Sequence, residues 1–132
     1  MNILLAEDEP DIQLIARIAL EDEGHYVVVV DDGAAAVERM QVEPFDVVLL
    51  DVMMPRLDGF GACRHLKDDP RTRHIPIIFL TARSQSFDVR AGLDLGAIGY
   101  IIKPFDVFTL WEEIATLLAQ PHGDPAAGER TS

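Results

Sequence analysis

Short apolar runs recur along the chain at fairly even intervals. They are rich in valine and isoleucine and do not alternate with polar residues, which is the pattern of parallel strands buried between helices on both faces of a sheet. We therefore predict a strand for each run. The predicted strands cover residues 2–6, 26–30, 46–50, 75–80 and 99–103.

The segments between these runs carry helical spacing. Residues 10–23 place apolar side chains on one broad face, with Pro10 in the first turn, where proline is tolerated, and Gly24 as the stop. That face is predicted from Ile12, Leu14, Ile15, Ile18 and Ala19. A second apolar stripe follows Asp106, a predicted cap, and predicts a final helix. This stripe consists of Val107, Leu110, Trp111, Ile114, Leu117 and Leu118.

The segment between the fourth and fifth predicted strands has a weaker pattern. Its apolar residues Phe87, Val89, Leu93 and Leu95 lack clean helical spacing, and Gly92 lies among them. An interior glycine costs a helix about 1 kcal/mol relative to alanine. We predict a marginal and mobile helix in this segment.

Strands that alternate with helices predict one doubly wound α/β domain. Parallel strands need right-handed crossovers, and these crossovers place helices on both faces of the sheet. The domain is predicted to span residues 1–120, a length that supports one hydrophobic core. Residues 121–132 lose all periodicity and collect proline, glycine and small polar residues, so we expect a disordered tail or the stub of a linker.

The chain is strongly acidic, with 23 acidic residues against 11 basic ones and a formal net charge of −12. This charge repels phosphates, so we expect no direct binding to nucleic acid or to anionic membrane surfaces. Cys63 is the single cysteine and allows no internal disulfide. The N-terminal apolar run is too short for a signal peptide or a membrane span, and we expect a cytoplasmic protein.

Polar residues mark the carboxyl ends of the predicted strands. Glu7 and Asp8 follow the first strand, Asp51 the third and Thr81 the fourth, and Lys103 ends the fifth. In doubly wound sheets, ligands bind beyond this edge, at the point where the strand order reverses. Two carboxylates about 4 Å apart repel by on the order of 4 kcal/mol at an effective dielectric constant of about 20. Such a cluster predicts a bound cation.

The ligand types at this edge suit a hard cation. All-oxygen ligands without a nearby histidine or cysteine favour Mg²⁺, which would bind carboxylates together with the backbone carbonyl of Met53. The ammonium of Lys103 and the hydroxyl of Thr81 complete a site for a phosphoryl group. Asp51 is then a candidate nucleophile, because carboxylates accept phosphoryl groups covalently and a metal that bridges both reactants assists the transfer.

The chain carries the motifs "LLAEDE", "DVVLLDVMMPRLDG", "IIFLTA", "GLDLGA" and "YIIKPF", in this order. Together they resemble the receiver domains of two-component response regulators, from Asn2 to about Gln120. The resemblance implies a flavodoxin-like fold, with five helices around a parallel sheet of strand order 2-1-3-4-5. It also implies Asp51 as the phosphoacceptor, and Glu7 and Asp8 as the acidic pocket that holds Mg²⁺ or Mn²⁺.

The same resemblance implies a switch. Thr81 and Lys103 would sense the phosphoryl group, Tyr100 would be the switch aromatic, and the Lys103-Pro104 peptide bond would be cis. The phosphoryl donor would be a sensor histidine kinase or a phosphotransfer protein. Phosphorylation would change the binding of an unknown downstream protein through the face formed by the fourth helix, the fifth strand and the fifth helix, and a phosphorylation-dependent homodimer stays open. Such a protein is a signalling phosphoacceptor that assists its own phosphorylation and dephosphorylation, rather than an enzyme.

Other interpretations compete with this one. The main alternative is a pseudo-receiver that acts as a docking module without phosphorylation, since a fold can outlive its chemistry. A flavin carrier would need a hydroxyl- and glycine-rich loop where this chain has "AEDEPD", and a phosphohydrolase would need an acid at Met53. We interpret Glu9 and Asp11 as acids that favour a helix start, and Asp58 as a helix cap.

Overall fold

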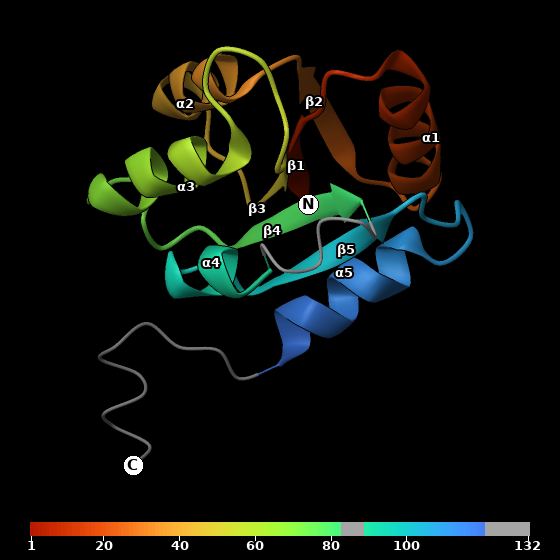
Figure 1. Cartoon of the computed structure of the whole chain (residues 1–132). Helices are drawn as coiled ribbons and strands as arrows, with labels where there is room; N and C mark the ends of the chain where they lie inside the picture. The colour runs from red at the N-terminus through yellow and green to blue at the C-terminus, as the bar shows by residue number, and fades with distance from the viewer. Residues whose placement is uncertain (83–88, 121–132) are drawn as a thin grey trace.

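The computed structural model describes residues 1–82 and 89–120, in which strands and helices alternate along the chain (Figure 1). The strands are β1 (Asn2–Ala6), β2 (Tyr26–Val30), β3 (Val47–Asp51), β4 (Ile77–Ala82) and β5 (Gly99–Lys103). The helices are α1 (Pro10–Glu21), α2 (Gly33–Val42), α3 (Gly59–Asp68), α4 (Val89–Asp94) and α5 (Leu110–Ala119). Phe87 and the predicted tail at residues 121–132 lie outside the described residues. None of the described helices has both the length and the apolar character that a membrane span requires.

The strands form one parallel sheet in the order β2-β1-β3-β4-β5, which confirms the predicted topology. β1 lies between β2 and β3, so the strand order reverses there. Asp51 pairs in register with Leu80, and Thr81 pairs with Ile102. The carboxyl ends of β1, β3, β4 and β5 therefore meet at one edge of the sheet.

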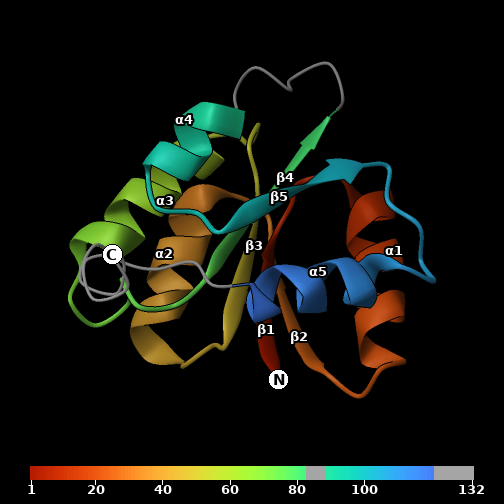
Figure 2. The same ribbon diagram turned by 90° about the horizontal axis from the view of Figure 1, so that it is seen from below.

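Helices cover both faces of the sheet, and each face has its own apolar core (Figure 2). α1 and α5 cover one face, where the fully buried residues include Ile3, Leu5, Leu49, Leu80 and Ile114. α2, α3 and α4 lie on the other face, where the fully buried residues include Leu4, Val48, Leu50, Ala62 and Cys63. Because successive residues of a strand point to opposite faces, neighbours such as Leu4 and Leu5 belong to different cores.

Two predicted strands are shifted in the structure. β3 starts at Val47 rather than at residue 46, and it includes Asp51 as its last residue. β4 starts at Ile77 rather than at residue 75. Pro76 has no N–H for the sheet, although its carbonyl accepts a hydrogen bond from the backbone N–H of Val48 at 3.0 Å.

The apolar face predicted for α1 is right at Ala19 and partly right at Ile12, which is half-buried, but it is wrong at Leu14, Ile15 and Ile18. The residues of α1 that are buried against the sheet are Ala16, Ala19 and Leu20, whereas Leu14 and Ile18 are exposed. The predicted apolar stripe and the stripe that is buried both satisfy helical spacing, so periodicity alone does not choose between them. The small alanines face the sheet because they let the helix approach it closely. The helix ends at Glu21, and Gly24 follows it with a positive φ of 89°, as its role as the stop requires.

Aspartates cap the helices on the other face. The side chain of Asp32 accepts from the N–H of Ala35 at the start of α2, and Asp58 accepts from the N–H of Gly61 in α3, both at 2.8 Å. Asp58 is therefore the cap that the sequence predicted. Asp106 accepts instead from the N–H of Phe108 at 2.7 Å, so it caps the turn before α5. Arg56 also pairs with Asp32.

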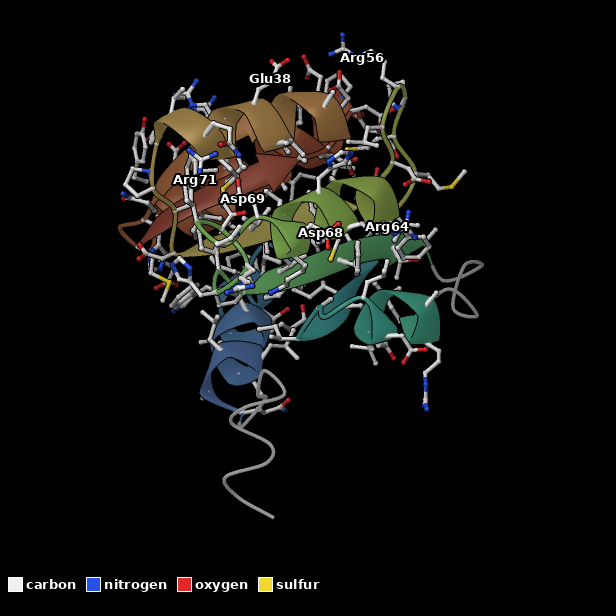
Figure 3. The ribbon with its side chains drawn as sticks, turned by 90° about the vertical axis from the view of Figure 1, so that its left-hand side faces the viewer. Glu38, Arg56, Arg64, Asp68, Asp69 and Arg71 are labelled. Carbon is white, nitrogen blue, oxygen red and sulfur yellow. The ribbon has the colours of Figure 1, made fainter. Side chains whose placement is uncertain are left out.

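Charged side chains tie the loop after α3 to α2 (Figure 3). Asp69 accepts hydrogen bonds from the side chain and backbone of Arg71 and from the Gln41 amide, at distances of 2.9 to 3.3 Å. The hydrogen bond from the Arg71 side chain, followed by the one from its backbone, lowers the pKa of Asp69 to about 2. Asp69 and Arg71 thus form a local ion pair on this face.

α4 is short, in line with the weak pattern of its sequence, and Gly92 has a packing role there. A Cβ at Gly92 would lie 2.6 Å from Cε2 of Phe79. Phe79 is buried, and its ring packs edge-on against Phe60 with the ring centroids 5.1 Å apart. The glycine therefore lets α4 lie directly on these two rings.

Replacing Gly92 with alanine tests this packing role. Helix propensity alone would make the variant more stable by about 1 kcal/mol. Overpacking against the confined Phe79 ring costs about 1–3 kcal/mol, so we expect Gly92→Ala to lower the free energy of unfolding by about 1 kcal/mol. Urea denaturation measures this change, and a variant more stable than the wild type would contradict the packing role.

Candidate functional site

The alternation of side chains along each strand brings three charged residues to the same face of the sheet. Glu7 continues the positions of Ile3 and Leu5, which belong to the core under α1 and α5. Asp51 and Lys103 continue the positions of Leu49 and Ile101, in the same core. Residues two apart in a strand point the same way. All three charged side chains therefore gather at the carboxyl edge on the α1 and α5 side.

The Lys103 ammonium lies among three carboxylates, two from the loop after β1 and one from the end of β3. Its Nζ is 3.0 Å from Oε1 of Glu7, 3.2 Å from Oδ2 of Asp51 and 3.5 Å from Oε1 of Glu9. The lysine side chain is 11 % exposed, and those of Glu7 and Asp51 are 0 % and 2 % exposed. This buried ion pair links the end of β5 to the ends of β1 and β3.

Burial and crowding shift the pKa values of this group. Burial, with a hydrogen bond to Asp51, raises the pKa of Glu7 to about 8, although Lys103 opposes the change. Burial lowers the pKa of Lys103, but the hydrogen bond to Glu7 and the charge of Asp51 outweigh it, so the pKa is raised overall. One ammonium does not fully compensate the carboxyl groups beside it, and Glu7 consequently holds a proton more readily than a free carboxyl does.

The carboxyl groups form a cluster suited to a divalent cation. Glu7, Asp8, Glu9 and Asp51 each offer an oxygen, and these oxygens all lie within 4.8 Å of one another. Asp8 is exposed, so the cluster is open to solvent on one side. Mg²⁺ prefers oxygen ligands and keeps several waters, and this donor set fits it. Because the cluster holds four carboxyl groups and only one lysine, it attracts a cation and repels an anion such as a phosphoryl group until a cation is bound.

The backbone after Asp51 is tightly packed. The N–H of Met53 donates to Oδ1 of Asp51 at 3.3 Å, and the N–H of Gly59 donates to the carbonyl of Val52 at 3.0 Å. A Cβ at Gly59 would lie 2.3 Å from the carbonyl oxygen of Asp51, so no larger residue fits there. The start of α3 thus braces the strand end that presents Asp51.

Thr81 and Tyr100 lie on the opposite face of the sheet from Lys103. Thr81 is buried, and its hydroxyl donates to the carbonyl of Ala82 at 3.3 Å. Tyr100 pairs in register with Phe79, two residues before Thr81, which makes Tyr100 and Thr81 diagonal neighbours on adjacent strands. The Lys103-Pro104 peptide bond is cis, as the resemblance implied.

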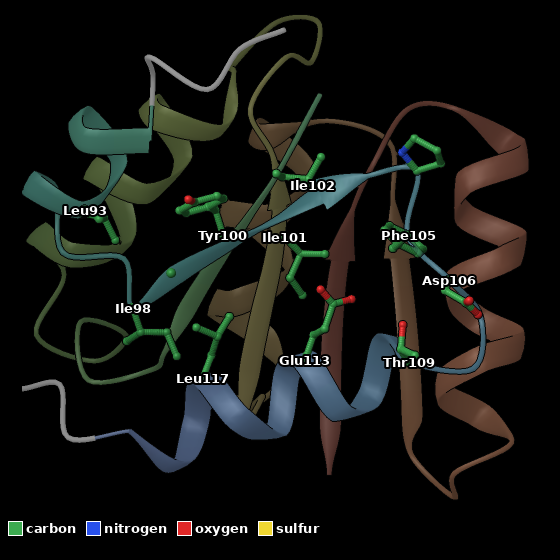
Figure 4. Close-up of a pocket in the computed structure, with 12 residues that line it drawn as sticks. Leu93, Ile98, Tyr100, Ile101, Ile102, Phe105, Asp106, Thr109, Glu113 and Leu117 are labelled. Atoms are coloured by element: carbon green, nitrogen blue, oxygen red, sulfur yellow. The ribbon is translucent and has the colours of Figure 1, made fainter. Parts of the chain in front are cut away.

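Tyr100 also lines a groove of about 700 Å³ between β5 and α5 (Figure 4). The Tyr100 ring and Leu93 of α4 lie at one side, and Glu113 and Leu117 of α5 lie at the other. The tyrosine is 40 % exposed. The sequence-predicted residues therefore divide into the ionic cluster at the strand ends and the tyrosine on this groove.

Sequence reasoning missed one residue of the ionic cluster, Glu9, and one neutral neighbour of it, Gln13. Glu9 was interpreted as an acid that favours the helix start, yet its carboxylate contacts Lys103. Gln13 was not singled out, and its amide donates to the carbonyl of Glu7 and, at 2.8 Å, to Oδ1 of Asp31. A signal for Glu9 exists in the sequence, because glutamate directly before Pro10 occupies a capping position that it serves poorly.

The chain is similar to known signalling proteins. Residues 3–115 match the family model of the response regulator receiver domain. The chain is 39 % identical over 124 residues to the response regulator ArlR of Staphylococcus epidermidis, covering 93 % of this chain and 55 % of ArlR. It is 38 % identical over 130 residues to the transcriptional regulatory protein CseB of Streptomyces coelicolor, covering 98 % of this chain and 54 % of CseB. The chain thus spans about half the length of these relatives.

Solved structures show the same fold. The chemotaxis response regulator CheY4 of Vibrio cholerae superposes with a TM-score of 0.82 at 28 % identity, over 88 % of this chain and 97 % of CheY4. The receiver domain of the sensor histidine kinase PA1611 from Pseudomonas aeruginosa superposes with a TM-score of 0.81 at 33 % identity, over 90 % of this chain and 98 % of that domain. That receiver domain holds a magnesium ion coordinated in its active site cleft.

Removing the charge of Lys103 tests how much this charge contributes to the stability of the fold. Lys103→Met keeps the apolar stem but leaves Glu7 and Asp51 buried without their cation, a change that costs about 3 kcal/mol in comparable ion pairs. We expect Lys103→Met to lower the free energy of unfolding by about that amount in metal-free buffer. In buffer well above pH 8, where Glu7 is ionised, the double variant Lys103→Met/Glu7→Gln should recover part of the loss, because one buried charge is then absent. Equal stabilities of wild type and Lys103→Met in urea titrations would contradict this account.

Proposed function

The chain belongs to the response regulator receiver domain family, and from this premise we propose that it is a phosphorylation-activated switch of a two-component phosphorelay, with Asp51 as the phosphoacceptor. The single observation that carries the proposal is the contact of the buried Asp51 carboxylate with Lys103 inside a cluster of oxygen ligands. Glu7 also contacts Lys103, but it follows the end of β1, whereas Asp51 is itself the last residue of β3.

The proposed reaction is a direct transfer. A carboxylate oxygen of Asp51 attacks the phosphorus of a phosphohistidine on a sensor kinase or a phosphotransfer protein. A P–O bond forms to Asp51 as the P–N bond to the donor imidazole breaks, and the imidazole takes up a proton from solvent. Braced by β3 and the start of α3, Asp51 is held ready for this attack without large reorganisation. The chain thus acts as a phosphoacceptor in signalling, and we propose that it assists both its own phosphorylation and its dephosphorylation.

Four groups would hold a divalent cation at this site, namely the carboxylates of Glu7, Asp8 and Asp51 and the backbone carbonyl of Met53. Mg²⁺ or Mn²⁺ bound there would neutralise charge on the transferring phosphoryl group. Asp8, which is exposed and makes no ion pair with Lys103, would bear most of the contact with the cation, because Glu7 already pairs with Lys103. The acidic cluster supports this arrangement, because it repels an incoming phosphoryl group until a cation balances it.

Phosphorylation would then redistribute the partners of Lys103 and Thr81. Charged hydrogen bonds contribute about 1.5–3 kcal/mol each. Moving a two-state equilibrium from 1:99 to 99:1 requires about 5.5 kcal/mol. Lys103 already has carboxylate partners, so a hydrogen bond to a phosphoryl oxygen would contribute less net free energy at Lys103 than at a lysine without partners. The Thr81 hydroxyl must therefore supply a substantial part of the driving force.

We propose that the output surface is the face formed by α4, β5 and α5. Tyr100 is the diagonal neighbour of Thr81, so a shift of Thr81 toward the phosphoryl group would open space for the tyrosine ring. The groove beside Tyr100 would change shape as the ring moves. A downstream protein, or a second copy of the chain, would detect that change.

Other properties of the whole protein also stay proposals. CseB is named as a transcriptional regulatory protein, and the chain covers about half of its length. We propose that the domain makes no direct contact with nucleic acid or with membranes, because the whole chain carries a net charge of −12, and that it works in the cytoplasm. We also propose a boundary near residue 120, with residues 121–132 as a tail or linker.

Intact mass after incubation with acetyl phosphate tests the phosphoacceptor. With Mg²⁺ we expect the wild type to gain one phosphoryl group, and we expect no gain with EDTA or in Asp51→Asn. Asp58→Asn is the matched control, since Asp58 caps α3 and should leave phosphorylation intact. If neither acetyl phosphate nor a histidine kinase phosphorylated the wild type, a phosphorylation-independent docking module would replace this proposal.

Thermal unfolding with increasing Mg²⁺ tests the cation site. A ligand that binds the folded state stabilises it by about 1.4 kcal/mol at ten times its dissociation constant, so Mg²⁺ should raise the Tm of the wild type. Asp8→Asn should abolish most of this rise, whereas Asp11→Asn, which removes an exposed charge nearby, should retain it. The same rise in Asp8→Asn as in the wild type would show that Mg²⁺ binds elsewhere.

A further inference from the structure

Glu9 occupies the N-cap position of α1 but does not cap the helix. It lies directly before Pro10, its backbone is extended, and its side chain makes no capping hydrogen bond. Aspartate, asparagine and serine are preferred at this position, because their short side chains reach the free N–H groups of the first turn. Glutamate is a poor choice there on grounds of helix stability.

The other helix starts show what this chain uses as a cap. Asp32 and Asp58 each accept a hydrogen bond at 2.8 Å from a backbone N–H in the first turn of α2 and α3. At α1 the longer side chain of Glu9 extends to the ionic cluster, where Oε1 lies 3.5 Å from Nζ of Lys103. The residue at this position is therefore better suited to contact Lys103 than to stabilise α1.

The contacts of Lys103 explain what Glu9 adds. A lysine ammonium has three N–H donors, and Lys103 faces three carboxylates, those of Glu7, Asp51 and Glu9. A phosphoryl oxygen can bind Lys103 only if one of these contacts is given up. The Glu9 contact is the longest of the three, and the Glu9 side chain is 63 % exposed, so water can replace the lysine there at little cost.

We propose that Glu9 is a positioning residue that holds the third N–H of Lys103 in the unphosphorylated state and releases it to the phosphoryl group on Asp51. The second half of this inference rests on the proposed function. Exposed ion pairs contribute about 0.2–1 kcal/mol, which corresponds to a factor of about 1.4 to 5 in an equilibrium constant. Glu9 therefore adjusts the balance between the two states and does not act as an on–off switch.

The first test measures Lys103 without any phosphorylation. Lys67 and Lys103 are the two lysines of the sequence, so lysine-selective ¹⁵N labelling gives two ammonium signals at low temperature. In metal-free protein, Glu9→Gln should raise the water-exchange rate of the Lys103 ammonium hydrogens by about 1.4- to 5-fold relative to Lys67. Lys67 is the internal reference, because its ammonium donates to the carbonyls of Arg73 and Ile75, away from the site.

Asp11→Asn is the matched control for charge. It removes one exposed acid from the first turn of the same helix, and it should leave the Lys103 exchange rate unchanged. An unchanged rate in Glu9→Gln, or an equal rise in both variants, would overturn the positioning role. Glu9→Ser should raise the exchange rate as Glu9→Gln does, and it should also raise the Tm by a few degrees because serine caps the helix.

The second test measures phosphorylation at a limiting concentration of acetyl phosphate with saturating Mg²⁺. The ratio of phosphorylated to unphosphorylated protein should be about 1.4 to 5 times higher in Glu9→Gln than in the wild type and Asp11→Asn. An equal or lower ratio would overturn the proposed release of Lys103. If the wild type is not phosphorylated at all, the proposed function fails, while the exchange rates still decide whether Glu9 positions Lys103.

Discussion

The contact of one lysine ammonium with buried carboxylates is the constraint on which the rest of this structure depends. Lys103 ends an edge strand, and its partners Glu7 and Asp51 end two strands in the interior of the sheet. Removing water from these charges is costly, and only their mutual attraction and hydrogen bonds offset that cost. The site is therefore stable while it holds a cation among its carboxylates, and sensitive to any group that competes for that cation.

The fold makes this arrangement with few special features. A parallel sheet gathers all of its carboxyl ends at one edge, and the alternation of side chains sends Glu7, Asp51 and Lys103 to the same face. Thr81 points to the other face, next to Tyr100 and the groove beside α5. A group bound to Asp51 can thus contact one residue on each side of the sheet, which is how chemistry at the edge would reach a surface some distance away.

Much of this was predictable from the sequence, because strands of valine and isoleucine with polar residues at their ends leave few alternatives. The convergence of the acids with Lys103 followed from that pattern, whereas the strand order was implied by the resemblance to receiver domains. The buried face of α1 did not follow from the pattern, because the exposed pair Leu14 and Ile18 satisfies helical spacing as well as the buried pair Ala16 and Leu20 does. Gly92 looked like a weak point of a helix, whereas its closeness to Phe79 depends on tertiary packing that no local pattern contains. Glu9 looked like a helix-start acid because its contact partner lies 94 residues away.

A crystal structure of the protein with Mg²⁺ and beryllofluoride, which mimics a phosphoryl group on a carboxylate, tests the account most directly. We expect beryllofluoride on Asp51, with the Lys103 ammonium and the Thr81 hydroxyl both within hydrogen-bonding distance of its fluorines. We also expect the contact between Lys103 and Glu9 to be lost. If Lys103 kept all three carboxylate contacts while beryllofluoride occupied Asp51, the exchange of lysine partners would not be the event that drives the switch.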